Sequence, residues 1–252
     1  MARPTVFFLH ALGGSARSWV AVANYLEDRF DCVALDLPGF GETSDLTGTT
    51  VEEMTDWLAK AIGARKTSQW MIVGHSMGAK LAAIIARRAS DGDAALAGLE
   101  RVCLFAGSPP SPEPMQEARR DKMIGWADTG PIGRADAHFF ITANTATPLA
   151  PLSLEAAIDD VCRTQRTAWL AWLERGSRED WSAVVGELDV PALIVAGSAD
   201  IDLGFAAQRD LNAPHWRNAV LDIVEGARHL LPLERPEEVA VLIDRHWSTP
   251  TS

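Results

Sequence analysis

The chain has 252 residues, with 34 acidic against 23 basic side chains and a formal net charge of -11. A protein this acidic has little with which to neutralise phosphate groups, which disfavours nucleic acid or an anionic membrane surface as a partner. Its hydrophobic fraction of 47% is typical of one globular domain, with or without an insertion, and no apolar run approaches the ~20 residues that span a membrane.

The first half of the chain alternates short apolar runs with helical segments. In chain order we expect a strand at residues 6–9, a helix at 15–26, a strand at 31–35, a helix at 50–62, a strand at 70–73, a helix at 79–88 and a strand at 102–105. Ser15 and either Thr49 or Thr50 are suitable N-caps for the first two helices. His10 interrupts the first apolar run, which favours a buried strand over a signal peptide.

This alternation stops between residues 111 and 185. The segment has helical signals divided by five prolines, and it holds four of the nine tryptophans. Alternation resumes with strands at 192–196 and 220–224 and helices at 205–211 and 236–246. Because strands joined by helices form parallel sheets, we predict an α/β fold. Its mostly parallel sheet of about six strands is built from residues 1–110 and 186–252, with 111–185 as a helical insertion.

The cysteines give information about the cellular compartment. Cys32, Cys103 and Cys162 are odd in number and far apart, so they indicate neither a disulfide framework nor a zinc motif. We expect reduced thiols and a cytoplasmic location.

The strongest chemical motif is Gly74-His75-Ser76-Met77-Gly78, between a predicted strand and a helix rich in small residues. In this G-x-S-x-G pattern the serine occupies a sharp turn that exposes its hydroxyl, and bulky residues at the glycines would keep strand and helix apart. The motif predicts Ser76 as a nucleophile; the alternative is a glycine-rich connection with an incidental serine. A serine hydroxyl needs a base, and the base needs an orienting group.

Ligands of a parallel sheet bind at the carboxyl ends of its strands, and this rule selects a base and an acid. His229 follows the strand at 220–224 and is the predicted base. Asp200 follows the strand at 192–196 and is the favoured acid, with Asp202 a close rival and Glu113 a third choice. The less suitable histidines are His75 inside the turn, His138 in the insertion, His215 at the opposite edge and His246 on the last helix.

Five ordered motifs resemble the α/β-hydrolase superfamily and together cover nearly the whole chain. They are Leu9-His10-Ala11-Leu12-Gly13-Gly14-Ser15, Asp36-Leu37-Pro38-Gly39-Phe40-Gly41, the serine motif, Gly197-Ser198-Ala199-Asp200, and the segment from Arg228-His229 to Pro236. The chain departs from the family pattern at Ala11, where His-Gly is usual, and at Arg228, where Gly is common. The resemblance further implies that the first two family strands are missing. A serine at position 76 argues against the superfamily's dehalogenases and epoxide hydrolases, which attack with a carboxylate.

The resemblance implies a catalytic triad of Ser76, Asp200 and His229, oxyanion-binding backbone N–H groups at Leu12 and Met77, and a helical cap at residues 111–185. It implies no metal and no organic cofactor. The side chains expected to contact substrate are His10, Ala11, Trp126, Phe139, Trp169 and Trp172. Tryptophans at this spacing more often pack the core of a cap than line a substrate site. His10 is also suited to bracing the oxyanion loop or to a hydrogen-bonded place in the core.

The predicted function is a serine hydrolase that cleaves a small to medium carboxylic ester with an apolar portion, through an acyl-enzyme. The same triad serves lactonases, thioesterases, amidases and carbon–carbon bond hydrolases, and fold alone does not choose among them. Two alternatives from other classes are a non-catalytic ligand receptor and a cofactor-free lyase or oxygenase in which Ser76 only donates a hydrogen bond. A small-molecule substrate is the partner expected, and self-association into a homo-oligomer stays open.

Overall fold

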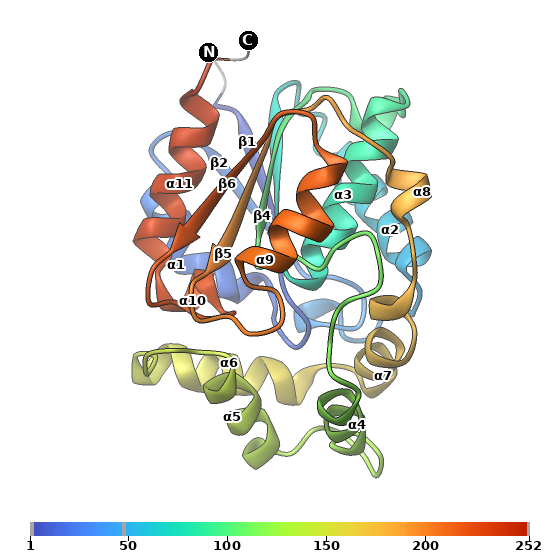
Figure 1. The fold of residues 1–252 in the computed structure, drawn as a ribbon, viewed down its shortest axis with the longest axis vertical. Helices are drawn as coiled ribbons and strands as arrows, with labels where there is room; N and C mark the ends of the chain where they lie inside the picture. Colours follow the sequence, from blue (N-terminus) through green and yellow to red (C-terminus); the bar gives the residue numbers. More distant parts are fainter. Residues whose placement is uncertain (1–2, 47–48, 251–252) are drawn as a thin grey trace.

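A computed structural model describes residues 3–46 and 49–250 and contains one six-stranded sheet (Figure 1). The strands are β1 (Thr5–Leu9), β2 (Asp31–Leu35), β3 (Trp70–His75), β4 (Leu99–Phe105), β5 (Ala192–Gly197) and β6 (Ala219–Val224). Every neighbouring pair is parallel, in the order β2-β1-β3-β4-β5-β6. The predicted α/β fold with about six parallel strands is confirmed. β4 begins at Leu99, three residues earlier than predicted. The prediction began too late because the charged residues Glu100 and Arg101 interrupt the apolar run.

Helices cover both faces of the sheet. On one face α1 (Val20–Leu26) packs against α11 (Pro236–Ser248); on the other lie α2 (Val51–Ala64), α3 (Met77–Ser90) and the short α8 (Ser182–Val185). Successive side chains of a strand point to opposite faces. Val6 and Phe8 of β1 therefore join the apolar cluster of α1 and α11, whereas Phe7 and Leu9 join that of α2 and α3.

The helix ends follow the capping signals in the sequence. Ser15 caps the 3₁₀ turn Ala16–Trp19 that leads into α1. Thr50, rather than Thr49, caps α2 and forms a capping box with Glu53. The predicted helix at 205–211 consists of the short α9 (Phe205–Ala207) and a π-helical turn, and α10 (Leu231–Glu234) precedes α11.

Residues 111–185, all of which the structure describes, contain helices and turns but no strand. Four helices gather beyond one end of the sheet (Figure 1): α4 (Glu117–Gly125), α5 (Arg134–Ala143), α6 (Pro151–Arg163) and α7 (Arg166–Glu174). The strand arrows point toward this end, so the insertion covers the carboxyl edge of the sheet. The division into a core domain and a cap domain at these boundaries stays a prediction.

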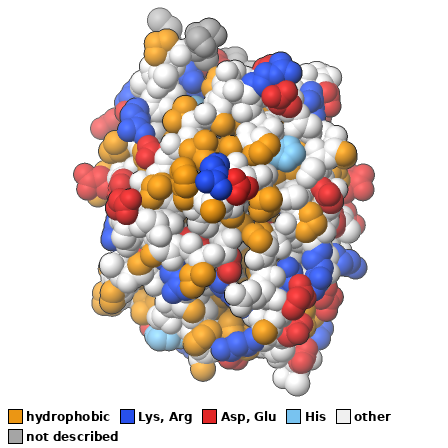
Figure 2. Space-filling view, in the orientation of Figure 1, with side chains coloured by type: hydrophobic (Ala, Val, Ile, Leu, Met, Phe, Trp, Pro, Cys, Tyr) orange, Lys and Arg blue, Asp and Glu red, His pale blue; other side chains and the backbone are white. Residues whose placement is uncertain are grey.

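Acidic and basic side chains lie interspersed on the face shown in Figure 2. Ion pairs such as that of Arg245 with Asp222 join side chains of opposite charge in the described residues. Within residues 3–46 and 49–250, no helix has both the length and the apolar character needed to cross a membrane.

The two glycines that flank Ser76 lie at close backbone contacts: Gly74 of β3 against α3, and Gly78 of α3 against the end of β1. A Cβ atom added to Gly74 would lie 2.5 Å from the carbonyl oxygen of Gly78, and one added to Gly78 would lie 2.7 Å from that of Leu9. Both distances are shorter than van der Waals contact, so the backbone would have to move. Packing therefore requires the two glycines of the serine motif.

We predict that Gly78→Ala lowers the free energy of unfolding by about 1–3 kcal/mol, the range for overpacked cores, because the added methyl group overlaps the backbone of β1. Denaturant unfolding followed by tryptophan fluorescence measures the change. Gly130→Ala is the matched control, since a Cβ there meets no atom within 4 Å. Unfolding curves that coincide for wild type and Gly78→Ala would contradict the prediction.

Candidate active site

Ser76 occupies a strained turn between β3 and α3. Its backbone has φ 51° and ψ -119°, a left-handed conformation that costs a non-glycine residue about 1–3 kcal/mol. Three hydrogen bonds hold the turn: Ser76 N donates to Phe105 O (3.0 Å), and Ser76 O accepts from Ala79 N (2.8 Å) and Ser108 N (3.0 Å). The strain is therefore supported by the end of β4 as well as by the start of α3.

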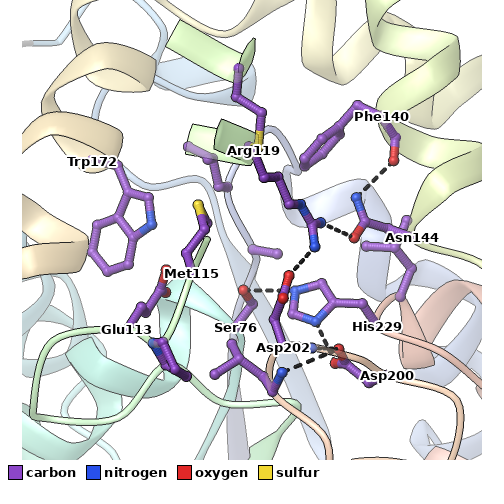
Figure 3. Close-up of a pocket in the computed structure, with 16 residues that line it drawn as sticks. Ser76, Glu113, Met115, Arg119, Phe140, Asn144, Trp172, Asp200, Asp202 and His229 are labelled. Atoms are coloured by element: carbon purple, nitrogen blue, oxygen red, sulfur yellow. Dashed lines mark hydrogen bonds and ion pairs between the residues drawn. The ribbon is translucent and has the colours of Figure 1, made fainter. Parts of the chain in front are cut away.

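The side chains of Ser76, His229 and Asp200 form one continuous hydrogen-bonded chain (Figure 3). His229 Nε2 lies 2.9 Å from Ser76 Oγ, and His229 Nδ1 lies 2.8 Å from Asp200 Oδ2. The second carboxylate oxygen of Asp200 accepts from the backbone N–H groups of Asp202 (3.1 Å) and Leu203 (3.2 Å). Three strand-following loops of the sheet thus meet at one point.

The pKa values of this chain favour an ionised acid beside a basic imidazole. Burial raises the pKa of Asp200. The charge of His229 and the hydrogen bonds that the carboxylate accepts outweigh burial and lower the pKa to about 2. Burial lowers the pKa of His229, yet the Asp200 charge and hydrogen bond outweigh burial and leave this pKa raised. The carboxylate accepts Nδ1–H, which leaves Nε2 of the neutral imidazole free to accept the Ser76 proton.

The two rival acids have other partners. Asp202 forms an ion pair with Arg119 of α4, and Glu113 accepts a hydrogen bond from the Ser108 hydroxyl. Burial raises the pKa of Glu113. In the described residues Asp200 is therefore the carboxylate that contacts His229 Nδ1.

Two other histidines support the loops of the site. His75 Nε2 donates to His229 O (2.7 Å), and burial lowers the pKa of His75 to about 3, so its ring stays neutral. His10 Nδ1 donates to Ala11 O (2.8 Å), and His10 Nε2 accepts from Leu37 N (3.0 Å). His10 thereby joins the loop after β1 to the loop after β2.

A cavity lies over the serine. Its polar lining consists of Ser76, Glu113, Arg119, Asn144, Asp200, Asp202 and His229. Its apolar lining consists of Ala11, Leu12, Pro114, Met115, Met123, Phe140, Trp172, Leu203 and Leu230. The cavity can therefore hold a molecule that has both a polar group and an apolar part.

Of the side chains predicted to contact substrate, Ala11 and Trp172 line this cavity, but His10, Trp126, Phe139 and Trp169 do not. Trp169 is fully buried and its indole N–H donates to Met123 O (2.9 Å). Trp126 packs against Phe139 and Trp169, and Phe139 is 48% exposed on the outer side. These aromatic rings stabilise the insertion, as packing alone predicts.

Lys80 of α3 contacts the ring of Trp172 through a cation–π interaction. Its buried ammonium group donates to Gly176 O (3.2 Å) and Glu179 O (2.9 Å) and lies 5.8 Å from the centre of the indole ring. Burial lowers the pKa of Lys80 to about 8. The wall opposite the histidine is therefore held to the core through α3.

The two residues predicted to bind an oxyanion are Met77, which follows Ser76 in the chain, and Leu12, which lines the same cavity as Ser76. Met77 is the first residue of α3, where a backbone N–H has no partner within the helix. Leu12 follows β1 and lines the cavity. Their role in catalysis stays a prediction.

The insertion contacts the loops that carry these groups. Asn144 O, at the end of α5, accepts from the backbone N–H groups of both His229 and Leu230 (3.1 Å each). On the oxyanion side, the Ser15 hydroxyl donates to the buried Asp160 of α6 (2.7 Å). Sequence reasoning missed Arg119 and Asn144, because neither belongs to a motif and only the folded insertion brings them to the site.

Comparison with known proteins gives both a family and a fold. The family model described as "Alpha/beta hydrolase family" matches residues 6–242. The chain is 28% identical over 262 residues to a biotin biosynthesis bifunctional protein of Teredinibacter turnerae, an alignment that covers 96% of this chain and 44% of that protein. It is 21% identical over 248 residues to the (E)-2-((N-methylformamido)methylene)succinate hydrolase of Acinetobacter baylyi, covering 92% and 85%.

A solved structure shows the same fold. The enol-lactonase from Burkholderia xenovorans superposes with a TM-score of 0.82 at 19% identity, covering 99% of this chain and 93% of that chain. The chain spans less than half the length of several curated relatives that it matches, so their activities do not transfer directly.

We predict that Asp200→Asn lowers the pKa of His229, because burial then acts on the imidazole without the opposing carboxylate charge. In the wild type, His229 stays protonated to a pH above the ordinary histidine pKa of 6.5. Any activity that uses His229 as a base therefore rises with pH through that raised pKa. An NMR titration of the imidazole protons measures the shift. Ser76→Ala, which keeps the carboxylate, is the control. A His229 pKa that is equal in wild type and Asp200→Asn would contradict the assignment.

Proposed function

The chain belongs to the alpha/beta hydrolase family, and on that premise we propose that it hydrolyses a small to medium carboxylic ester through an acyl-enzyme on Ser76. The observation that carries the proposal is the unbroken Ser76–His229–Asp200 hydrogen-bonded chain that borders a partly apolar cavity. Serine activation needs this arrangement of nucleophile, base and orienting acid.

The proposed reaction has two half-reactions. Ser76 Oγ attacks the ester carbonyl carbon while His229 Nε2 takes the hydroxyl proton. The tetrahedral intermediate collapses, His229 returns the proton to the departing alcohol oxygen, and the acyl group stays on Ser76. A water molecule then attacks in the same way and releases the carboxylic acid and free Ser76. Asp200 stabilises the imidazolium in each half-reaction, and these steps use no cofactor.

The backbone N–H groups of Met77 and Leu12 are proposed to bind the oxyanion. A donor of this kind contributes ~10²–10³-fold to turnover in serine hydrolases. The hydrogen bonds that Asn144 and Asp160 accept from the loops after β6 and β1 support a role of the insertion as a cap. Chemistry then belongs to the strand ends and substrate selection to the cap.

We propose a cytoplasmic location, because the cysteines are odd in number and far apart in the sequence. Cys32, Cys103 and Cys162 are all free thiols in the structure, in keeping with a cytoplasmic enzyme.

We predict that an aryl phosphonate ester labels one residue per chain, and that peptide mapping finds it on Ser76. Ser76→Ala abolishes both labelling and hydrolysis of short-chain p-nitrophenyl esters. Steady turnover beyond one equivalent separates an esterase from a receptor, which releases at most a stoichiometric burst. Substantial activity in Ser76→Ala would instead favour a lyase or oxygenase that uses the serine as a hydrogen-bond donor.

We predict that Trp172→Ala changes the preference for ester chain length, because this indole lines the cavity. Its removal enlarges the apolar end, and kcat/KM for longer esters rises relative to shorter ones by about tenfold. Trp169→Ala is the matched control: it removes the same side chain from a fully buried position that does not line the cavity, so it lowers stability by about 3–5 kcal/mol without changing the ranking. An unchanged ranking in Trp172→Ala would remove this residue from the substrate site.

A further inference from the structure

Arg119 is the one lysine or arginine among the described residues that line the cavity. It belongs to α4 of the insertion, and Figure 3 shows its side chain extending into the cavity toward Asp202. Its charge acts on His229, whose pKa it lowers slightly against the effect of Asp200. A permanent cation therefore lies within electrostatic range of the proposed chemistry.

The guanidinium keeps hydrogen-bonding capacity after its contacts with described residues are counted. Nη1 donates to Asp202, and Nη2 donates to Asn144 Oδ1 (2.7 Å). These bonds use two of the five N–H donors of an arginine. The side chain is 34% exposed and lines the cavity, so a molecule that enters the cavity can contact it.

The counter-charge of Arg119 is itself part of the cavity lining. Asp202 lies two residues from Asp200, and its side chain is 18% exposed. An incoming carboxylate can take the place of Asp202 on the guanidinium fork, which matches carboxylate geometry in a bidentate way. The other acidic wall residue, Glu113, accepts a hydrogen bond from the Ser108 hydroxyl, and burial raises the pKa of its carboxyl group.

We propose that Arg119 binds a carboxylate of the substrate, so that the ester cleaved is a monoester of a dicarboxylic acid. This inference rests on the proposed ester hydrolysis. In it Asp202 is the counter-ion that the substrate displaces, and Asn144 holds the guanidinium in place through its side-chain oxygen. The contrary interpretation is that the Arg119–Asp202 pair only joins the insertion to the core.

The test compares two substrates that differ only in charge. Monomethyl succinate, glutarate and adipate are each paired with the neutral dimethyl ester of the same acid, and methanol release gives kcat/KM for both. The measured quantity is the ratio of the anionic to the neutral value. We expect Arg119→Met to lower this ratio by about 10- to 100-fold, the range for a charge-assisted hydrogen bond.

Asp202→Asn separates substrate binding from a purely structural role. It removes the competing carboxylate, so the ratio rises above the wild-type value if Arg119 binds the substrate. Arg134→Gln is the charge-matched control, because Arg134 is an exposed arginine of the same insertion that pairs with Glu155 and Asp159 outside the cavity. Its ratio stays at the wild-type value. An unchanged ratio in Arg119→Met, or shifts of the same sign in Arg119→Met and Asp202→Asn, overturns the proposal.

A binding measurement keeps this result apart from the fate of the proposed function. If wild type cleaves no ester and Ser76 takes no label, the hydrolase proposal fails, but calorimetry with glutarate still tests the anion site. Binding to wild type that is lost in Arg119→Met and kept in Arg134→Gln supports the site. No binding to wild type, or equal binding to wild type and Arg119→Met, overturns it.

Discussion

The turn at Ser76 is the constraint on which the rest of the site depends. A serine with φ 51° between a buried strand and a buried helix persists only where the surroundings hold it. Here the end of β4 bonds to it through Phe105 and Ser108. Gly74 lets β3 lie against the backbone of α3, and Gly78 lets α3 lie against the backbone at the end of β1. The hydroxyl therefore stands at the carboxyl edge of the sheet, where the loops after β5 and β6 bring Asp200 and His229.

The insertion is structurally continuous with those loops. Asn144 accepts hydrogen bonds from two consecutive backbone N–H groups of the histidine loop. Glu234 of α10 accepts from the backbone N–H of Ala146 in the insertion and from that of Arg228, beside the base. A shift of α5 relative to the sheet would change the position of His229. Substrate binding to the insertion can thus affect the geometry of the base as well as the shape of the cavity.

The cavity has an apolar wall and a polar wall. Its apolar wall, with Trp172 held in place by Lys80, suits a hydrocarbon portion of a ligand. Its polar wall holds an ion pair, Arg119 with Asp202, next to the hydrogen-bonded chain of the triad. Asp202 is paired with Arg119, whereas Asp200 is the carboxylate that contacts the His229 imidazole.

The sequence by itself determined the order of the six strands along the chain, the absence of a strand from residues 111–185 and the serine turn between a strand and a helix. Those features depend on local patterns: apolar runs, capping residues such as Ser15 and Thr50, and glycines two residues on either side of Ser76. It also ranked Asp200 first, but spacing alone could not separate Asp200 from Asp202, because both follow β5. Tertiary structure decided that choice, since Arg119 arrives from a helix far away in the chain. It likewise decided that Trp172 faces the cavity while Trp169 does not, because one helix carries both and only packing against the core sets which side is open.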